Sequence, residues 1–364
     1  MDFTSLGVPA PLAAALAARG ITEPTEIQRE VIPAACTGEN LIGEAPTGTG
    51  KTLAYLLPAL MRIDPAVRAA QVLVLAPTHE LAMQIAGAAR DLIQAAGLSV
   101  GVQALIGGAN VQRQIDALKK KPALIVGSAP RIVELHRLRK LKLQEVRLCV
   151  LDEFDRLLDK QHSAEVRTVL HLLPRERQML FLSATAAAAA VHAAEELCAL
   201  RIIRAAVQET TCENYYHIVP FRDKIKAVQK LTRRLPIRRG LVFVGRSFDA
   251  EKAAEKLQYE GIRVAALLGG ERRDQRRAAL NAIRTGRVQL LLSTDLAARG
   301  LDIADVDYVV QVDLPEDVRT YRHRAGRTAR AGKEGTVISL VDAKEVERLK
   351  ALAVRMKLDL KKIN

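Results

Sequence analysis

Short runs of consecutive apolar residues recur along the chain and alternate with segments whose apolar residues repeat every three to four positions. The first series of apolar runs lies at 73–75, 124–126, 148–151 and 179–182. The second lies at 241–244, 264–267, 289–292, 308–310 and 336–340. Helical periodicity lies between them, for example at 80–96, 250–259 and 344–356. Continuous apolar strands separated by helices predict an α/β fold with parallel sheets, each covered by helices on both faces.

Two such series predict two domains. A chain of 364 residues is too long for one ordinary core and suits two domains of roughly 150–200 residues. The segment 204–214 is mixed and polar and has no clear period. We therefore expect domains at 1–206 and 213–364, joined by a linker at 207–212.

The net charge of +14 is unevenly distributed. Residues 1–207 carry 23 Lys and Arg against 20 Asp and Glu, whereas residues 208–364 carry 32 against 21. Such asymmetry is typical of a surface that binds a polyanion, although a solvated basic surface has the same composition. Aromatic residues make up 3% of the chain and Trp is absent, which favours contact with backbone phosphates over base stacking.

The composition also limits the cell compartment and the metal chemistry. No apolar run approaches the roughly 18 residues of a membrane span, and the first residues lack the features of a signal peptide, so we expect a cytoplasmic protein without a membrane partner. The four cysteines are widely spaced and form no CxxC pair. They are expected to be buried free thiols rather than zinc ligands.

The segment 45–52 carries the strongest chemical signal. It follows an apolar stretch at 41–42 and precedes a helical one at 53–61, which is the strand–loop–helix setting of a phosphate-binding loop. Its glycines allow backbone N–H groups to face an anion, Lys51 can reach the β- and γ-phosphates, and the Thr52 hydroxyl can bind Mg²⁺. The nucleotide ligands expected here are Thr47, Gly48, Thr49, Gly50, Lys51 and Thr52.

An acidic group follows the apolar run at 148–151. Asp152 is placed at the carboxyl end of a predicted strand to hold Mg²⁺, largely through water, and Glu153 is the natural base for the attacking water. An acidic helix N-terminus is the structural alternative, and it fits Asp155 best.

Three arginines occur within residues 323–330. They suit either a solvated basic helix or arginine fingers that stabilise the charge on a transferred phosphoryl group, with Arg327 and Arg330 as the candidates.

Taken together, these motifs resemble those of the DEAD-box RNA helicases of helicase superfamily 2, in the order of that family and over nearly the whole chain, from Phe3 to about Val341. The resemblance implies two tandem RecA-like domains, an RNA-stimulated ATPase, and ATP and Mg²⁺ as cofactors. Phe3 and the segment 20–28 resemble the Q motif, in which Gln28 would read adenine and Phe3 would support or stack on it. In the same way, Asp302 would contact the ribose or the attacking water.

The resemblance also assigns residues to RNA binding and to coupling between the domains. Those expected to line the RNA groove are Pro77, Thr78, Gly107, Gly108, Ser128, Arg131, Arg276 and Thr294. Those expected to couple the nucleotide site to the other domain are Asp155, Ser183, Thr185, Arg299 and His323.

Several positions depart from the family pattern. Phe154 replaces the alanine of the name-giving tetrapeptide, and His79 replaces an arginine of the RNA groove. The segment Ala129-Pro130 replaces Pro-Gly. Further differences occur at Leu268, Arg273 and Ala329. The ATPase residues are thus retained while the RNA-side residues are altered.

The leading hypothesis is an ATP-dependent RNA helicase that clamps single-stranded RNA by its backbone, separates short duplexes and hydrolyses ATP to recycle. An ATP-dependent RNA clamp or assembly scaffold with little unwinding, and a DNA translocase, remain as alternatives. The sequence ends soon after the second domain, so we expect either that a protein partner provides targeting or that the sequence is a piece of a longer chain, and the enzyme is expected to be a monomer.

Overall fold

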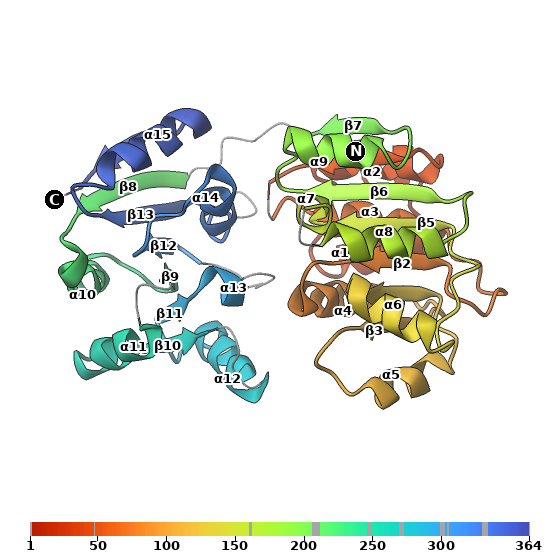
Figure 1. The fold of residues 1–364 in the computed structure, drawn as a ribbon, viewed down its shortest axis with the longest axis horizontal. Coiled ribbons are helices and arrows are strands. Elements are labelled where there is room, and N and C mark those ends of the chain that lie inside the picture. The colour runs from red at the N-terminus through yellow and green to blue at the C-terminus, as the bar shows by residue number, and fades with distance from the viewer. Residues whose placement is uncertain are drawn as a thin grey trace. The chain divides into compact units, whose positions relative to one another are not determined.

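The computed structural model describes residues 2–46, 48–159, 162–205, 212–245, 249–268, 273–298, 303, 306–329 and 334–363. The chain divides into two compact units, Met1–Val207 and Gln208–Asn364 (Figure 1). Each unit has a sheet and a set of helices of its own.

The first unit is built on a parallel sheet of seven strands, as far as its described residues go, in the order β3-β4-β2-β5-β6-β1-β7. The strands are β1 (Leu41–Glu44), β2 (Val72–Leu75), β3 (Val102–Leu105), β4 (Leu124–Gly127), β5 (Leu148–Asp152), β6 (Gln178–Ser183) and β7 (Arg201–Arg204). The helices are η1 (Thr4–Leu6), α1 (Ala10–Ala17), α2 (Glu26–Cys36), α3 (Lys51–Met61), α4 (His79–Ala95), α5 (Val111–Leu118), α6 (Ala129–Arg137), α7 (Phe154–Leu157), α8 (Ser163–Leu172) and α9 (Ala188–Glu195).

Both faces of this sheet are covered. Because successive side chains of a strand point to opposite faces, Val72 and Val74 of β2 join the core formed with α1, α2, α3 and α4. Leu73 and Leu75 join the core formed with α6, α7, α8 and α9. A central strand such as β2 is therefore apolar at every position, which explains the continuous apolar runs in the sequence.

The second unit repeats this plan within its described residues, with a parallel sheet of seven strands in the order β10-β11-β9-β12-β13-β8-β14. The strands are β8 (Cys212–Ile218), β9 (Gly240–Phe243), β10 (Val264–Leu267), β11 (Leu290–Ser293), β12 (Tyr308–Gln311), β13 (Gly335–Val341) and β14 (Leu360–Lys362). The helices are η2 (Phe221–Asp223), α10 (Lys224–Arg234), α11 (Ala250–Tyr259), α12 (Arg273–Arg284), α13 (Asp295–Ala298), α14 (Val318–Ala325) and α15 (Val346–Met356).

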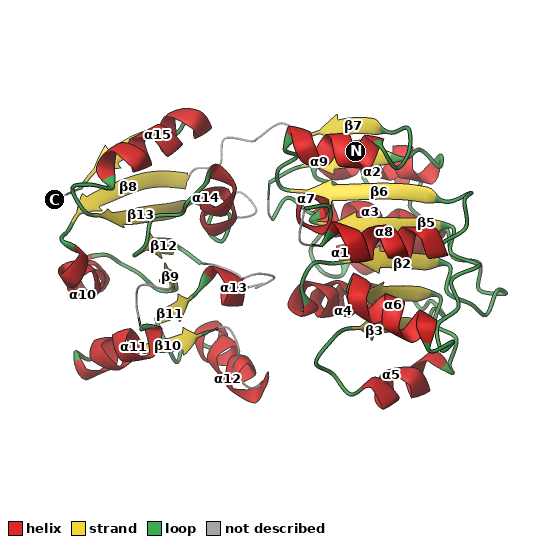
Figure 2. Ribbon diagram, in the orientation of Figure 1, coloured by secondary structure: helices red, strands yellow, loops and turns green. Residues whose placement is uncertain are grey.

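The helices of the second unit also flank their sheet on two sides (Figure 2). Val242 of β9 packs with α10 and α11. Its neighbours Leu241 and Phe243 pack with α12, α14 and α15. The predicted α/β class, with two parallel sheets flanked by helices, is confirmed.

Four strands lie outside the predicted runs: β3, β7, β8 and β14. Three of them are sheet edges, and β8 is next to an edge. A strand at an edge is less completely covered, so polar residues are tolerated and the apolar run is interrupted. The predicted linker at 207–212 needs one correction, because Cys212 is the first residue of β8. Residues 206–211 lie outside the described part of the chain.

Candidate functional site

The loop between β1 and α3 has the backbone of a phosphate-binding loop. Gly48 and Gly50 have φ of 84° and 88°, a left-handed conformation that glycine adopts readily. Helix α3 begins at Lys51, directly after Gly50, so the unsatisfied N–H groups of its first turn face the loop. Thr47 lies outside the described residues.

Lys51 is folded back onto its own loop. Its ammonium donates hydrogen bonds to the carbonyl oxygens of Ala45, at 2.5 Å, and Pro46, at 2.7 Å. The Thr49 hydroxyl donates to the same Pro46 oxygen at 2.7 Å. The predicted phosphate ligand is thus held at the loop by two carbonyl groups that a phosphate would have to replace.

Helix α2 is tied to this loop by two polar side chains. The Gln28 amide nitrogen donates to the Gly50 carbonyl at 3.0 Å, and its amide oxygen accepts from the Thr25 N–H at 3.0 Å. The Thr25 hydroxyl donates to the Thr49 carbonyl at 2.7 Å. A β-carbon at position 50 would collide with the Gln28 amide, so this close approach also requires glycine.

Gln28, the predicted adenine reader, is 1% exposed and lies beside the phosphate loop through its hydrogen bond to Gly50. Phe3 is 2% exposed and belongs to the core of α1, α2, α3 and α4. In this structure it therefore supports the Q-motif segment from within the core.

Asp152 ends β5 at the same edge of the sheet as the phosphate loop, because the carboxyl ends of parallel strands meet at one edge. Its carboxylate accepts from the Tyr55 hydroxyl at 2.9 Å and from the Glu153 N–H at 3.0 Å. Burial, and then the neighbouring charge of Glu153, raise the pKa of Asp152 to about 6. The Tyr55 hydrogen bond and the charge of Lys51 act in the opposite direction.

The oxygen donors here suit Mg²⁺, which prefers one or two protein oxygens together with phosphate and water. Asp152 supplies a carboxylate and Thr52 a hydroxyl from the first turn of α3. No cluster of three or more His, Cys, Asp or Glu residues that could hold a metal by itself occurs among the residues described. A nucleotide would have to complete the coordination.

Glu153 has a left-handed backbone, with φ of 52°. Such a conformation is strained for a residue with a side chain, and here it makes the sharp turn from β5 into α7. The Glu153 carboxylate is half-buried and lies 3.1 Å from the guanidinium of Arg156. The turn holds the predicted base beside Asp152.

Three predicted coupling residues come together at the ends of β6 and α7. The Thr185 hydroxyl donates to the Asp155 carboxylate at 3.2 Å, and the Ser183 hydroxyl accepts from the Thr185 N–H at 3.2 Å. Asp155 is 6% exposed and Ser183 1%. Asp155 therefore does more than place a negative charge in the first turn of α7. It also links the acidic turn to the segment after β6.

A second group of predicted residues lines a cavity of about 320 Å³ in the first unit, beyond the carboxyl ends of β2, β3 and β4. Pro77, Gly107, Ser128 and Arg131 all contribute to it, as does His79. Thr78 and Gly108 do not line it. The Thr78 hydroxyl instead caps α4 by accepting from the Leu81 N–H at 3.2 Å, and Gly108 has a φ of 66°.

Arg131 is the buried cation of this cavity. It is 7% exposed, and its Nε lies 2.8 Å from a carboxylate oxygen of Glu134. Its Nη1 has no hydrogen-bond partner among the described residues. A buried guanidinium with one end unsatisfied suits an anionic ligand.

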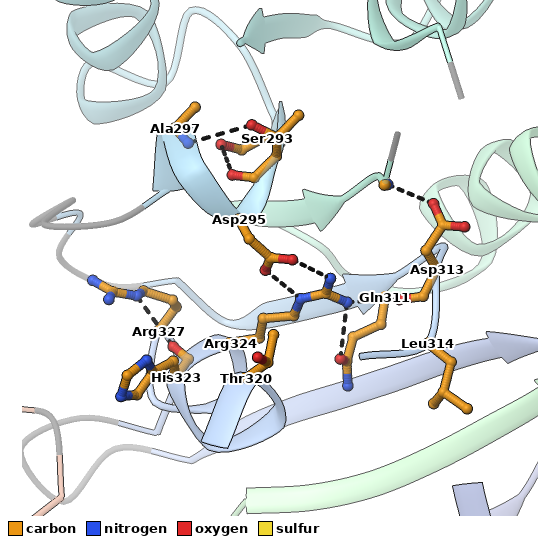
Figure 3. A network of polar contacts seen from close by, with 12 residues as sticks. Ser293, Asp295, Ala297, Gln311, Asp313, Leu314, Thr320, His323, Arg324 and Arg327 are labelled. Atoms are coloured by element: carbon orange, nitrogen blue, oxygen red, sulfur yellow. Dashed lines mark hydrogen bonds and ion pairs between the residues drawn. The ribbon is translucent and has the colours of Figure 1, made fainter. Parts of the chain in front are cut away.

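In the second unit, Arg324 organises a network that the sequence did not indicate (Figure 3). It is 3% exposed, and its Nε and Nη2 donate to both carboxylate oxygens of Asp295 at 2.6 and 2.7 Å. Its Nη1 donates to the carbonyl of Asp313 at 2.6 Å and lies 3.3 Å from the side-chain oxygen of Gln311. The guanidinium also lies 4.9 Å from the ring centre of Phe243. The interpretation of this segment as a solvated basic helix is therefore wrong for Arg324.

Around this network lie several predicted residues. Arg327 is half-exposed and its Nε donates to the His323 carbonyl at 3.3 Å. Thr294 accepts from the Ala297 N–H at 3.3 Å, and Arg276 donates to the Ala297 carbonyl at 2.9 Å, so Arg276 and Thr294 meet at α13. Predicted residues that lie outside the described part of the chain are Arg299, Asp302 and Arg330.

Two residues near the phosphate loop were not predicted. Tyr55 is fully buried and burial raises its pKa well above the usual range, so it stays a hydrogen-bond donor to Asp152. The only feature of the sequence that could have indicated Tyr55 is its hydroxyl within an otherwise apolar helix, one turn after Lys51. Glu44, the last residue of β1, accepts from the Ala186 N–H at 3.0 Å and has no comparable signal.

Within the described residues, no helix combines the length and the apolar character that crossing a membrane requires.

Comparisons with known proteins agree with this arrangement. Residues 25–193 match the DEAD/DEAH box helicase family, and residues 223–332 match the helicase conserved C-terminal domain. The chain is 42% identical to the DEAD-box ATP-dependent RNA helicase CshC of Bacillus cereus, over 93% of this chain and 87% of that protein. It is 40% identical to the probable ATP-dependent RNA helicase YfmL of Bacillus subtilis, over 94% and 91%.

Solved structures extend the likeness to the fold. The structure of S. cerevisiae Dbp5 bound to RNA and ADP BeF3 is 28% identical and covers 100% of this chain and 95% of its own, with a TM-score of 0.90. The matches to both helicase domains and to relatives along nearly the whole sequence show that the chain belongs to the DEAD/DEAH box helicase family.

Proposed function

We propose that this protein is an ATP-dependent RNA helicase that clamps single-stranded RNA by its backbone, separates short duplexes locally and hydrolyses ATP to recycle. The observation that carries the proposal is the phosphate loop after β1, with Asp152 and Glu153 at the same edge of the sheet. The names of CshC and YfmL describe ATP-dependent RNA helicases, and the Dbp5 structure contains RNA and ADP BeF3. In this proposal residues 1–206 form the ATP-binding domain, and residues 212–364, which begin with β8, form the C-terminal helicase domain.

ATP binding begins with an exchange at the phosphate loop. The Lys51 ammonium leaves the carbonyls of Ala45 and Pro46 for the β- and γ-phosphates, and the N–H groups of the loop and of α3 donate to phosphate oxygens. Gln28 has both a donor and an acceptor, so its amide suits the adenine edge. Thr52 and Asp152 are the proposed holders of Mg²⁺, which when bound neutralises charge on the phosphates.

Hydrolysis requires a base and a compensating cation. The attacking water forms a bond to the γ-phosphorus and gives its proton to Glu153, while the bond from the γ-phosphorus to the bridging oxygen breaks and ADP leaves. Arg327 and Arg330 are the proposed fingers that stabilise the charge on the transferred group. Arg324 is buried on Asp295 and serves instead to hold α14. The proposed coupling residues are Asp155, Ser183, Thr185, Arg299 and His323.

RNA is proposed to bind along the cavity that contains Pro77, Gly107, Ser128 and Arg131, and at Thr294 and Arg276 of the second unit. Thr78 and Gly108 belong to the same proposed surface. Contacts to phosphates carry no base information, so binding should be independent of sequence, and the 2′-hydroxyl would distinguish RNA from DNA.

The proposal is tested by measuring ATPase activity with and without RNA, together with displacement of a short RNA duplex. RNA should stimulate ATP turnover and the duplex should separate only when ATP is present. Arg327→Ala should lower turnover by about 10³-fold, as expected for a finger, with ATP binding little changed. Turnover that RNA does not stimulate would contradict the proposed function, and unchanged turnover in the variant would contradict the role of Arg327.

One observation favours an RNA clamp with little unwinding as a second candidate. His79 lines the RNA-side cavity where the family has an arginine, and it lies against Gly107, where an added β-carbon would be 3.0 Å from His79 Nε2. Unlike a guanidinium, an imidazole offers no permanent charge to a phosphate. RNA-stimulated ATP turnover without strand displacement would select this candidate. We also propose a monomer in the cytoplasm that a protein partner directs to its RNA.

A further inference from the structure

The second unit carries a cluster of arginines at the edge of its sheet opposite to its helicase motifs. We call it the basic edge and define it as Arg233, Arg234, Arg238, Arg263, Arg284 and Arg287, all of which are exposed. Three of them come directly before a strand or within three residues of it: Arg238 before β9, Arg263 before β10 and Arg287 before β11. Arg233 and Arg234 end α10, and Arg284 ends α12.

The strand register brings these segments together. Val264 of β10, Leu290 of β11 and Gly240 of β9 are direct partners across the sheet, so the residues that precede them lie side by side at its amino edge. Two hydrogen bonds agree with this placement: Arg263 donates to the Gly286 carbonyl at 3.0 Å, and Arg239 donates to the Arg284 carbonyl at 3.0 Å.

Little negative charge lies within this edge. Among its described residues, Glu260 lies 3.6 Å from Arg233, and Asp307 lies 3.7 Å from Arg238. Asp307 also accepts from the backbone N–H groups of Arg238 and Arg239, at 2.9 Å each, so both oxygens of its carboxylate already accept a hydrogen bond. The side chain of Arg238 remains 90% exposed. Among the described residues of the edge, arginines outnumber carboxylates, which favours a positive surface.

An exposed aromatic residue adjoins the arginines. Tyr259, the last residue of α11, is 91% exposed. It is followed by Glu260, whose carbonyl accepts from Arg233 at 2.8 Å. Arginines beside an exposed aromatic ring suit a nucleic acid, because guanidinium groups contact phosphates while the ring stacks on a base. An acidic protein segment would pair with the arginines but would give the Tyr259 ring no base to stack on.

We propose that the basic edge is a second RNA-binding surface, which holds RNA that flanks the segment gripped at the helicase motifs. The motifs follow the carboxyl ends of β11 and β12, and these strands are four residues long, so the two surfaces lie about 13 Å or more apart. The inference rests on the proposed function for the identity of the ligand. It gives the chain an RNA-anchoring surface of its own.

The test compares two RNAs in the presence of a non-hydrolysable ATP analogue. One is a single strand of about ten nucleotides, which is too short to occupy both surfaces at once. The other is the same strand extended to about four times that length. Affinity for each is measured by fluorescence anisotropy at several salt concentrations. The variant is Arg263→Gln, Arg284→Gln and Arg287→Gln combined, and the control is Lys344→Gln, Lys350→Gln and Arg355→Gln, which removes three exposed cations near and on α15.

The variant should bind the long RNA about tenfold more weakly, with a log–log salt slope smaller by about 2, and should bind the short RNA as the wild type does. The control should bind both normally. Tyr259→Ala, at a position where little packing is lost, should weaken only the long RNA, by about fivefold. A long-RNA affinity equal to that of the control would overturn the inference and assign the edge to another anionic partner. Failure of the wild type to bind even the short RNA would instead contradict the proposed function.

Discussion

Phe154 stands where the family has an alanine, and its surroundings explain how the chain accommodates it. The side chain is 0% exposed and packs edge-on against Phe181, with ring centres 5.7 Å apart and planes at 74°. It begins α7 immediately after the left-handed Glu153. The ring therefore anchors, from within the core, the strained turn that presents the proposed base.

We expect Phe154→Ala to lower the free energy of unfolding of the first unit by about 3 kcal/mol, because the cavity left behind cannot collapse fully. Urea denaturation followed by circular dichroism measures this loss. Phe154→Leu, which retains most of the volume, should cost about 1 kcal/mol. An alanine variant as stable as the wild type would mean that the ring is not an anchor.

Asp152 should make stability depend on pH. Its pKa is about 6 in the folded state against 3.8 for the unfolded reference, so between these values the folded chain retains a proton that the unfolded chain has released. The resulting stabilisation is full below about pH 4 and is lost as pH rises through 6. Asp152→Asn lacks this titration, so wild type should lose up to about 3 kcal/mol relative to the variant between pH 4 and 7. Urea denaturation of both proteins across this range measures it, and parallel pH profiles would contradict it.

At the scale of elements, hydrogen bonds of Gln28 join α2 to the phosphate loop, and a bound adenine would have to replace or share them. Gln28 donates to Gly50 and accepts from Thr25, so one side chain fixes both the start of α2 and the start of α3. Both contacts are made by a residue that is 1% exposed.

Gln28→Glu should raise the KM for ATP about tenfold, because a carboxylate would face the Gly50 carbonyl and would lack the donor that adenine requires. Steady-state ATPase kinetics measure the change. Gln114→Glu is the matched control, since Gln114 is 6% exposed and bridges the Ile106 N–H and carbonyl at 3.1 and 3.0 Å. The control should reduce stability but leave KM unchanged; equal KM values in the two variants would refute the role of Gln28.

The central elements could be predicted from the sequence because the residues that identify each of them are neighbours in the chain. Strands such as β2 and β5 are buried on both faces and read as apolar runs, and the phosphate loop combines its glycines with Lys51 over a few residues. Edge strands such as β7, with its sequence Arg-Ile-Ile-Arg, have no such pattern. The Arg324–Asp295 pair joins residues 29 positions apart, and its burial depends on how β11, β12 and α14 assemble. A basic run in the sequence does not indicate which arginine is enclosed.

At the scale of the whole molecule, charge is concentrated in the second half, which carries 32 Lys and Arg against 21 Asp and Glu. Long-range attraction of RNA and release of its counterions should therefore contribute strongly to affinity.

RNA affinity should fall steeply with salt, with a log–log slope of about 0.7 for each phosphate neutralised on a single strand. Titrations of a single-stranded RNA at increasing potassium chloride concentrations measure this slope. A flat response would contradict binding through the backbone.

The resting position of Lys51 has a further consequence for which anions the enzyme accepts. An ammonium already satisfied by two carbonyl oxygens offers little to a small, weakly held ion such as inorganic phosphate or sulfate. A triphosphate can outcompete those oxygens because it engages the loop N–H groups and the lysine at once. We therefore expect a ligand with several adjacent charges to draw Lys51 from these carbonyl oxygens more readily than a single small anion does.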